Sequence, residues 1–424
     1  MMVALLGIAI AVLLIIRVPV AFAFLGPSIV YMWLNDQSVG NALREVFNAA
    51  NSFPMLAVPL FVLLGALANH AGIADRLFRF ALAVLARVRG SLGYVAIGTS
   101  VGFSWMSGSA VADAAALGKV QIPQMIRAGY GRRFATGVSA SSALIAPVMP
   151  PSIPAVIYAG LAAVSTGGLF AASVIPALLM AAGLVVVVAV LVARNTNITR
   201  GEFDKREVLA ATKGVILPMI TPVIILGGIL GGFFTPTEAA AVAAVYILLV
   251  GIVQRTLTWR GLLAALKETV LTTGAIMLIV ATASLLGYIL ARERLPQLMT
   301  DAMLSVSDDP TVFLLLVVVL CLILGTVIDA TAVLVLIVPI LIPIANTYGV
   351  DPIVLGVVTI IALMIGLLTP PVGTVLFVTS SVSKTRIGDV FRGTAPFLVP
   401  LIVVVLLAVL FPDAVMWLPG VLGL

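Results

Sequence analysis

The chain has 424 residues, of which 62% are hydrophobic and 9% are charged, and its mean hydropathy is +1.26. A water-soluble domain could not keep so much apolar surface from aggregating, so the composition excludes a soluble protein and indicates an integral membrane protein. The 23 Lys and Arg residues outnumber the 17 Asp and Glu residues, but they are spread over short loops, which argues against a nucleic-acid partner.

Long uncharged runs occur throughout the chain, and each has the length of a helix that crosses the hydrocarbon core or most of it. None alternates between polar and apolar residues as the strands of a β-barrel do. The clearest runs are 2–16, 18–34, 54–68, 170–193, 214–234, 236–253, 270–291, 311–328, 330–345, 353–369 and 394–411, and more lie in the Gly-rich region 91–166. We therefore expect an all-α polytopic membrane protein with roughly a dozen crossings, some of them incomplete.

The connectors between these runs predict the orientation of the chain. Basic residues gather in 76–89, 127–133, 194–213, 255–267 and 384–392. The loops around Asp36, Asp308 and Asp351, the segment 162–169 and the tail 412–424 contain no Lys or Arg. The positive-inside rule places the basic connectors in the cytoplasm, so both termini are expected on the periplasmic side.

Two connectors, 38–52 and 256–268, are short and amphipathic. This pattern predicts either arms that lie on the membrane surface or ordinary connecting helices. A single cysteine, Cys321, excludes an intramolecular disulfide, and a single histidine, His70, argues against a His-based metal centre. His70 is expected to end a helix.

Three landmarks recur with nearly the same offset, which is about half the length of the chain. The pair Pro150-Pro151 is repeated by Pro370-Pro371, and the lone acid Asp113 is repeated by Asp329. The triplet Leu63-Leu64-Gly65 is repeated by Leu285-Leu286-Gly287. This constant offset predicts an internal duplication with two broken membrane helices, which is typical of the binding site of a transporter.

In the first half, Ser107, Gly108 and Ser109 interrupt an apolar stretch and expose hydroxyl and carbonyl oxygens. Prolines in 146–154 remove backbone donors and leave the carbonyls of Ala146 and Val148 without helical partners. Hard oxygen atoms on unwound backbone are what a Na⁺ ion needs at this depth. The structural alternative is that the small residues allow close helix packing and the prolines only kink the chain.

The second half repeats the arrangement with segments 324–332 and 366–373. Asp329 is predicted to be an ion ligand or an ion-coupled switch, with a buried structural partner as the alternative, because an ionised Asp in the bilayer is costly. For Asp113 a capping or hydrogen-bonding role in the broken helix is equally open. If 270–291 forms a re-entrant hairpin arm, its tip would bring Arg292 near Asp329 to bind a substrate carboxylate, whereas the alternative is an Arg that reaches the interface.

At these residues the chain resembles the large membrane subunit (M) of the tripartite ATP-independent periplasmic (TRAP) transporters. The matching stretches are SGSAVADAAALG, MPPSIPAVIYAG, GFFTPTEAAAVAA, LGTVIDATAVLVLIVPILIPIA and GLLTPPVGTVLFV, in that order along the chain. The motif of the family often reads SGSS, and here its fourth position, residue 110, is Ala, which removes one hydroxyl.

The resemblance implies an elevator-type fold, with a scaffold and a transport domain that contains two inverted repeats, re-entrant hairpins and broken helices. The implied division is 1–52 (scaffold helices and amphipathic arm), 53–193 (first repeat), 194–213 (cytoplasmic linker), 214–268 (scaffold helices and second arm), 269–393 (second repeat) and 394–424 (C-terminal helix). The implied Na⁺ sites are Ser107, Ser109, Ala146, Val148 and Pro151 in the first half, and Gly325, Asp329, Gly366, Thr369 and Pro371 in the second. Ser107 and Arg292 are the candidate contacts for the substrate.

The resemblance also implies Na⁺-coupled uptake of a small organic acid, such as a C4-dicarboxylate or sialic acid, across a bacterial or archaeal inner membrane. A periplasmic binding protein delivers the acid, and a small four-helix membrane subunit is expected as a separate partner because the chain opens directly into a spanning pair. No cofactor other than the coupling ion is expected. The main alternative is a stand-alone symporter that needs no binding protein. The few intramembrane acids argue against a membrane enzyme, and the duplicated broken helices argue against a passive channel.

Overall fold

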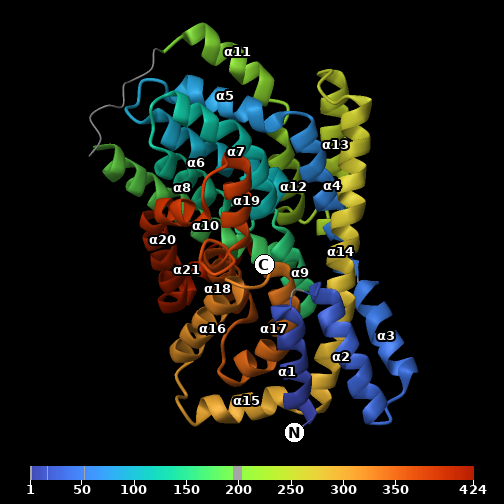
Figure 1. Ribbon diagram of the computed structural model, residues 1–424. Coiled ribbons are helices and arrows are strands. Elements are labelled where there is room, and N and C mark those ends of the chain that lie inside the picture. Colours follow the sequence, from blue (N-terminus) through green and yellow to red (C-terminus); the bar gives the residue numbers. More distant parts are fainter. Residues whose placement is uncertain (1, 17, 52, 194–202) are drawn as a thin grey trace.

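The computed structural model describes residues 2–16, 18–51, 53–193 and 203–424, and within these ranges every regular element is a helix. Figure 1 shows a molecule in which helices from both halves of the chain meet near the middle. The all-α prediction is therefore confirmed. Residues 194–202 of the predicted linker lie outside the described residues, and its remainder is partly helical, because α11 begins at Lys205.

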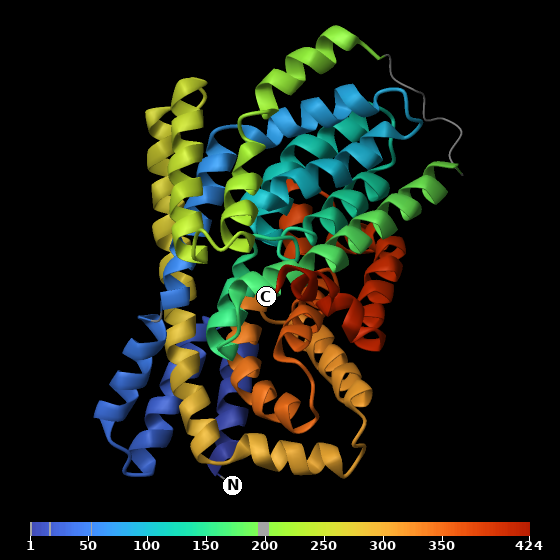
Figure 2. The ribbon, with the colours of Figure 1, turned by 180° about the vertical axis from the view of Figure 1, so that it is seen from behind.

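The N-terminal part of the chain, up to residue 85, consists of short helices. They are α1 (Met2–Ile15), α2 (Val20–Leu34), α3 (Val39–Ala50), the 3₁₀ turn η1 (Phe53–Leu56), α4 (Ala57–His70) and α5 (Ile73–Leu85). The predicted arm 38–52 is α3, and it runs beside α2 and the lower part of α14 in both ribbon views (Figures 1 and 2). Helices α4 and α5 form a pair bent by 62°.

Helices α6 (Ser91–Ser107) and α7 (Ala110–Arg127) form an antiparallel hairpin. Gln121 on α7 donates a hydrogen bond of 3.2 Å to the carbonyl of Ala96 on α6, and the hydroxyl of Tyr130, just past α7, lies against Ser91 at the start of α6. The tip of this hairpin is Gly108, whose φ of +58° reverses the chain. The SGS segment was expected to break a continuing helix; instead it turns the chain back.

The first broken helix follows the hairpin. Helix α8 (Arg132–Ala143) gives way to turns over 144–152 that contain the cis Pro150-Pro151 peptide, and α9 (Ile153–Ala162) then continues. Proline cannot donate to a helical hydrogen bond, so the Pro-Pro pair is where the helix must open. The predicted position of the break is confirmed.

The second half builds the same order of elements. Helices α16 (Pro310–Gly325) and α17 (Ala330–Thr347) form a hairpin, in which Phe313 near its start stacks on Tyr348 just past its end with ring centroids 5.0 Å apart. Helix α18 (Pro352–Gly366) is then separated from α19 (Thr374–Ser383) by a loop that contains the cis Pro370-Pro371 peptide. The open ends of the two hairpins lie at opposite ends of the molecule (Figure 1).

The remaining helices connect and flank these two units. They are α10 (Thr166–Ala193), α11 (Lys205–Val215), α12 (Ile220–Leu230), α13 (Pro236–Val253), α14 (Trp259–Arg292), α15 (Leu295–Leu304), α20 (Ile387–Leu410) and α21 (Pro412–Leu422). Five helices of the described chain are long and apolar enough to cross a membrane, and two bent pairs, α4–α5 and α11–α12, raise this number to seven. Six further helices among the described residues are apolar but only 10–17 residues long, and they include arms of hairpins and broken helices, so the expected number of complete and incomplete crossings stays a prediction.

Helix α14 differs most from the expectation. The amphipathic segment 256–268 and the apolar run 270–291 were expected to be an arm and a hairpin arm, but they belong to one helix of 34 residues. No proline interrupts the sequence between Trp259 and Arg292, so the backbone can stay helical while the composition changes. The predicted boundary between 268 and 269 therefore falls inside a helix.

The LLG triplets pack each half against its hairpin. A Cβ atom at Gly65 on α4 would lie 3.2 Å from the Cα of Ser107, at the tip of the first hairpin. A Cβ atom at Gly287 on α14 would lie 3.7 Å from Pro339 on α17 of the second hairpin. The repeat of this triplet thus reflects the packing of a straight helix on a hairpin in each half.

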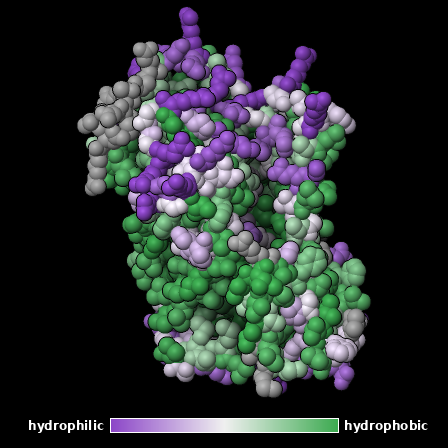
Figure 3. Space-filling model, viewed as in Figure 1, coloured by the Kyte–Doolittle hydropathy of each residue, from purple (hydrophilic) through white to green (hydrophobic). Residues whose placement is uncertain are grey.

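Hydrophilic side chains gather at one end of the molecule. In Figure 3 they cover the end where α5 and α11 lie in Figure 1, and the surface below is largely apolar. Residues 76–85 of the basic connector 76–89 and residues 205–213 of the connector 194–213 belong to these two helices. Described parts of two of the five predicted basic connectors thus lie at the hydrophilic end.

Candidate functional site

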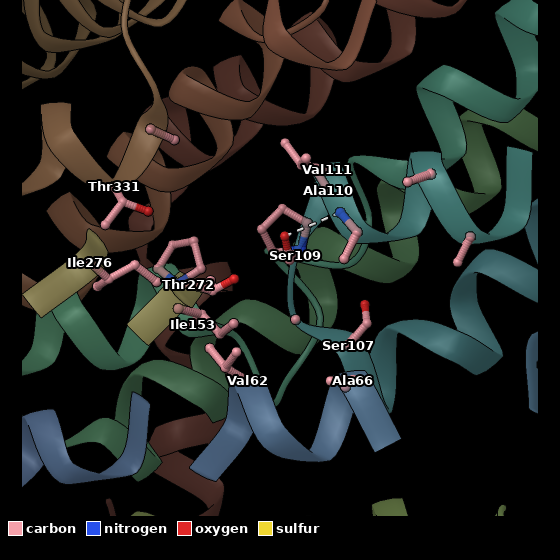
Figure 4. A pocket seen from close by; sticks show the side chains of 18 of the residues that line it. Val62, Ala66, Ser107, Ser109, Ala110, Val111, Ile153, Thr272, Ile276 and Thr331 are labelled. Atoms are coloured by element: carbon pink, nitrogen blue, oxygen red, sulfur yellow. Dashed lines mark hydrogen bonds between the residues drawn. The ribbon is translucent and has the colours of Figure 1, made fainter. Parts of the chain in front are cut away.

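A cavity of about 290 Å³ lies where the tips of the two hairpins approach each other. Its walls come from both hairpins, from the first broken helix and from the straight helices α4 and α14 (Figure 4). The polar residues that line it are Asn69, Ser107, Ser109, Glu268, Thr272, Asp329 and Thr331. Residues from both halves of the chain thus share one site.

Three helix N-termini face this cavity. The first residues of α7 (Ala110 to Ala112), of α9 (Ile153 and Pro154) and of α17 (Ala330 and Thr331) all line it. The N-terminus of a helix carries free N–H groups and the positive end of the helix dipole. Three of them converging on one cavity favour a negatively charged ligand there.

Two of these N-termini are capped by predicted site residues. The hydroxyl of Ser109 accepts a hydrogen bond of 3.4 Å from the amide of Ala112, and a carboxylate oxygen of Asp329 accepts one of 2.9 Å from the amide of Thr331. The offset from Ser109 to Asp329 equals the offset between the two Pro-Pro pairs. Asp329 therefore corresponds to Ser109, and the expected correspondence with Asp113 is wrong by one helical turn.

Each hairpin tip is tied to its own broken helix through the backbone. The amide of Ile153 donates to the carbonyl of Gly108 at 3.4 Å, and the amides of Val372 and Gly373 both donate to the carbonyl of Thr326 at 3.0 Å. Only glycine fits at the first tip, since a Cβ atom at Gly108 would lie 2.8 Å from the carbonyl oxygen of Pro151. The tips and the loops with the cis prolines therefore form two compact units.

The residues predicted for the first Na⁺ site lie in one of these units. Ser107 and Ser109 line the cavity, and Pro151 approaches the tip between them. Ala146 and Val148 are buried in the loop, and their carbonyl oxygens accept none of the hydrogen bonds found among the described residues. Hydroxyl and free carbonyl oxygens are hard donors of the kind that a Na⁺ ion requires, so the residues fit such an ion.

The residues predicted for the second Na⁺ site are arranged less compactly. Gly325 and Gly366 touch, because a Cβ atom at Gly366 would lie 2.8 Å from the Cα of Gly325. Asp329 faces the cavity, whereas the hydroxyl of Thr369 donates to the carbonyl of Ile365 at 3.1 Å and Pro371 is exposed. The loop with Pro371 is thus more open than the loop with Pro151, which is buried.

Arg292 does not lie at the cavity. It is the last residue of α14, whereas Ile276 is the last residue of that helix to line the site. At the rise of about 1.5 Å per residue, Arg292 lies about 24 Å beyond Ile276 along the helix axis. The expected approach of Arg292 to Asp329 depended on a hairpin tip at this position, and the continuous helix places it elsewhere.

The sequence interpretation missed the wall that α14 contributes. Glu268, Thr272 and Ile276 line the cavity at intervals of four residues, and Glu268 also lies 3.2 Å from His70 at the end of α4. Intervals of four place side chains on one face of a helix, and this spacing was the available signal. His70 ends a helix, as predicted.

Comparisons with known proteins agree with this geometry. Residues 7–414 match the family model of the tripartite ATP-independent periplasmic transporter, DctM component. The sialic acid TRAP transporter large permease protein SiaM of Vibrio cholerae is 43% identical over 409 residues, which cover 96% of each chain. The C4-dicarboxylate TRAP transporter large permease protein DctM of the same species is 35% identical over 448 residues, covering 100% of this chain and 98% of the relative.

A third relative, the 2,3-diketo-L-gulonate TRAP transporter large permease protein YiaN of Escherichia coli, is 34% identical over 403 residues and covers 94% of this chain and 95% of its own. Among solved structures, the YdaH transporter of Alcanivorax borkumensis is similar in fold, with a TM-score of 0.66 at 15% identity over 88% of this chain and 89% of that one. The chain therefore belongs to the DctM component family of the tripartite ATP-independent periplasmic transporters, and it is a multi-pass membrane permease and not an enzyme.

Proposed function

We propose that the protein takes up a small organic acid across the inner membrane by secondary transport coupled to Na⁺. The observation that carries this proposal is the charge of the cavity. Asp329 and Glu268 are the charged side chains among its described lining residues, and neither is a cation. An anion in this cavity has to be stabilised by the three helix N-termini and by cations that bind with it.

Na⁺ coupling follows from this charge balance. An organic acid placed beside Asp329 without a cation would be repelled, since like charges in a site of low dielectric constant repel strongly. Na⁺ ions held by the two tips would remove that repulsion and complete the positive environment. Binding of the ions and of the acid would then be cooperative, which is the requirement for coupled transport.

We assign the two ion sites to the tips and their loops. The first would use Ser107, Ser109 and the carbonyls of Ala146, Val148 and Pro151. The second would use Asp329, Thr369 and the backbone of Gly325, Gly366 and Pro371. The support for this assignment is that each group lies in one of the two units joined by backbone hydrogen bonds. The substrate would lie in the cavity between them, in contact with Ser107.

The substrate class is inferred from relatives. The names of the three relatives give sialic acid, a C4-dicarboxylate and 2,3-diketo-L-gulonate as substrates, and all three are small carboxylic acids. Family membership also supports a tripartite system, in which a small four-helix membrane subunit and a periplasmic binding protein act with this chain. The binding protein would select the acid and deliver it from the periplasm.

The arrangement also favours an elevator movement between the two sides of the membrane. Two hairpins with open ends on opposite sides are typical of an inverted repeat, and each hairpin would move with the broken helix to which it is bonded. The helices α4 and α14 border the cavity without belonging to either unit. We assign them to the scaffold against which the transport domain slides, with both chain termini on the periplasmic side.

The test is uptake of labelled organic acids into proteoliposomes that contain this chain and its small subunit. Sialic acid and C4-dicarboxylates should be compared under an inward Na⁺ gradient, with and without the periplasmic binding protein. Uptake that requires both supports the proposal. Uptake without the binding protein would instead favour a stand-alone symporter, and uptake without Na⁺ would contradict the coupling.

A further inference from the structure

Asp113 is a buried acid that the assignment above does not use. It lies in the first turn of α7 and is 0% exposed, and one of its carboxylate oxygens accepts a hydrogen bond from the hydroxyl of Ser107. The other oxygen, Oδ2, is buried and has no hydrogen-bond partner in the described part of the molecule. A buried carboxylate with an empty acceptor is expensive, so its retention here calls for a compensating group.

The elements around Asp113 supply no positive charge to it. The packed helices α6 and α19 contain no Lys or Arg, the basic side chains of α5, α7 and α8 are exposed or half-buried, and Asp113 forms no ion pair with the described residues. Ser107 is the group that lies between Asp113 and the cavity. A cation bound at Ser107 would therefore be the nearest counter-charge for this carboxylate.

The hydrogen bond also fixes the direction of the Ser107 hydroxyl. An ionised carboxylate only accepts hydrogen bonds, so Ser107 must donate its proton toward Asp113. The lone pairs of its oxygen are then free to face the cavity, as a cation ligand requires. Without Asp113 the hydroxyl could rotate and point its proton at the ion.

We propose that Asp113 is a positioning residue for the first Na⁺ site, which orients the Ser107 hydroxyl as an oxygen ligand. This inference rests on the proposed Na⁺ coupling. Asp113 does not itself touch the ion or the substrate. It acts through Ser107, so the effect of substituting Asp113 on Na⁺ binding should depend on the presence of Ser107.

The experiment measures Na⁺ binding directly, by the rise in melting temperature of the purified protein as Na⁺ replaces choline. Asp113→Asn keeps the size of the side chain but can donate as well as accept a hydrogen bond, so it no longer fixes the hydroxyl. We expect its apparent Kd for Na⁺ to rise about tenfold. In a Ser107→Ala background the same change should alter the Kd less than about twofold, since coupled residues are not additive.

Two further variants and the unmodified protein keep the outcomes distinct. Asp75→Asn, at an exposed acid of α5, should leave the Kd unchanged. Asp113→Glu keeps an acceptor-only carboxylate and should recover Na⁺ affinity even if Asp113→Asn folds poorly. If Asp113→Asn binds Na⁺ like the unmodified protein, or weakens binding equally with and without Ser107, the inference is wrong. If Na⁺ fails to stabilise the unmodified protein, the proposed coupling itself is wrong.

Discussion

The backbone amide of Gly373 lies 3.0 Å from the carbonyl oxygen of Thr326 and donates a hydrogen bond to it. This bond joins the loop after Pro370-Pro371 to the tip of the second hairpin. The equivalent bond in the first half runs from Ile153 to Gly108 at 3.4 Å, and the offset from Ile153 to Gly373 equals that between the two Pro-Pro pairs. Each proposed ion site thus involves two segments that cannot move apart without breaking a backbone hydrogen bond.

The close contact between Gly325 and Gly366 gives a first prediction. A methyl group at position 366 would lie within 3.0 Å of backbone atoms of Gly325 and Leu322, which cannot rotate away as a side chain could. We expect Gly366→Ala to destabilise the protein by about 1–3 kcal/mol and to abolish most uptake. The measurement is the melting temperature together with uptake in proteoliposomes.

Gly274→Ala is the matched control for this substitution. Gly274 also lies within a helix, α14, but a Cβ atom there would meet nothing within 4 Å. Alanine favours a helix more than glycine does, so this variant should be at least as stable as the unmodified protein. Equal stability of the two variants would show that α16 and α18 do not approach as closely as described.

A second prediction concerns the wall of the cavity formed by α14. Cys321 is the single cysteine and is fully buried, so a thiol reagent should react with the unmodified protein only weakly. Thr272→Cys should react with a small charged methanethiosulfonate, and Na⁺ with a transported acid should slow the reaction about tenfold or more, because the ligands fill the same space. Mass spectrometry of the labelled protein measures the rate.

Arg292→Cys provides the contrast on the same helix. Arg292 is exposed and lies outside the cavity, so its cysteine should react at the same rate with and without the ligands. Protection of position 292 but not of position 272 would place the substrate at the far end of α14. That result would restore the carboxylate contact that the sequence suggested for Arg292.

A third prediction concerns the orientation of the chain. The positive-inside rule places the end of the molecule with α5 and α11 in the cytoplasm, and the N-terminus lies at the opposite end (Figure 1). A reporter that is active only in the cytoplasm should therefore be silent when fused at the first residue. The same reporter fused after Lys384, in a basic connector, should be active, and the reverse pattern would overturn the orientation.

Much of this architecture could be predicted from the sequence, because specific residues, above all the Pro-Pro pairs, interrupt the helices. Pro150-Pro151 and Pro370-Pro371 each interrupt a helix, since proline lacks the backbone donor that a helix needs. The direction of the chain after a break could not be predicted. Neither Ser107-Gly108-Ser109 nor segment 326–329 has a residue that distinguishes a reversal from a kink.

The correspondence between the two halves shows why the sequence offset between residues was insufficient to identify the residues of the site. Asp113 and Asp329 are both lone acids at a nearly correct offset, but only Asp329 caps a helix at the cavity. Asp113 lies one turn further along and faces Ser107 instead. The wall from α14 was missed for a different reason, since an amphipathic stretch that runs directly into an apolar one can be a single helix.

The most direct test of the account is the Na⁺ dependence of uptake by Asp329→Asn in proteoliposomes that contain the small subunit and receive substrate from the binding protein. Asn caps helices about as well as Asp, so the substitution removes the carboxylate and its charge while it preserves α17. We predict that the Na⁺ concentration for half-maximal uptake rises at least about tenfold, which corresponds to about 1.4 kcal/mol. An unchanged Na⁺ dependence in this variant would contradict the assignment of Asp329 to an ion site and with it the proposed coupling.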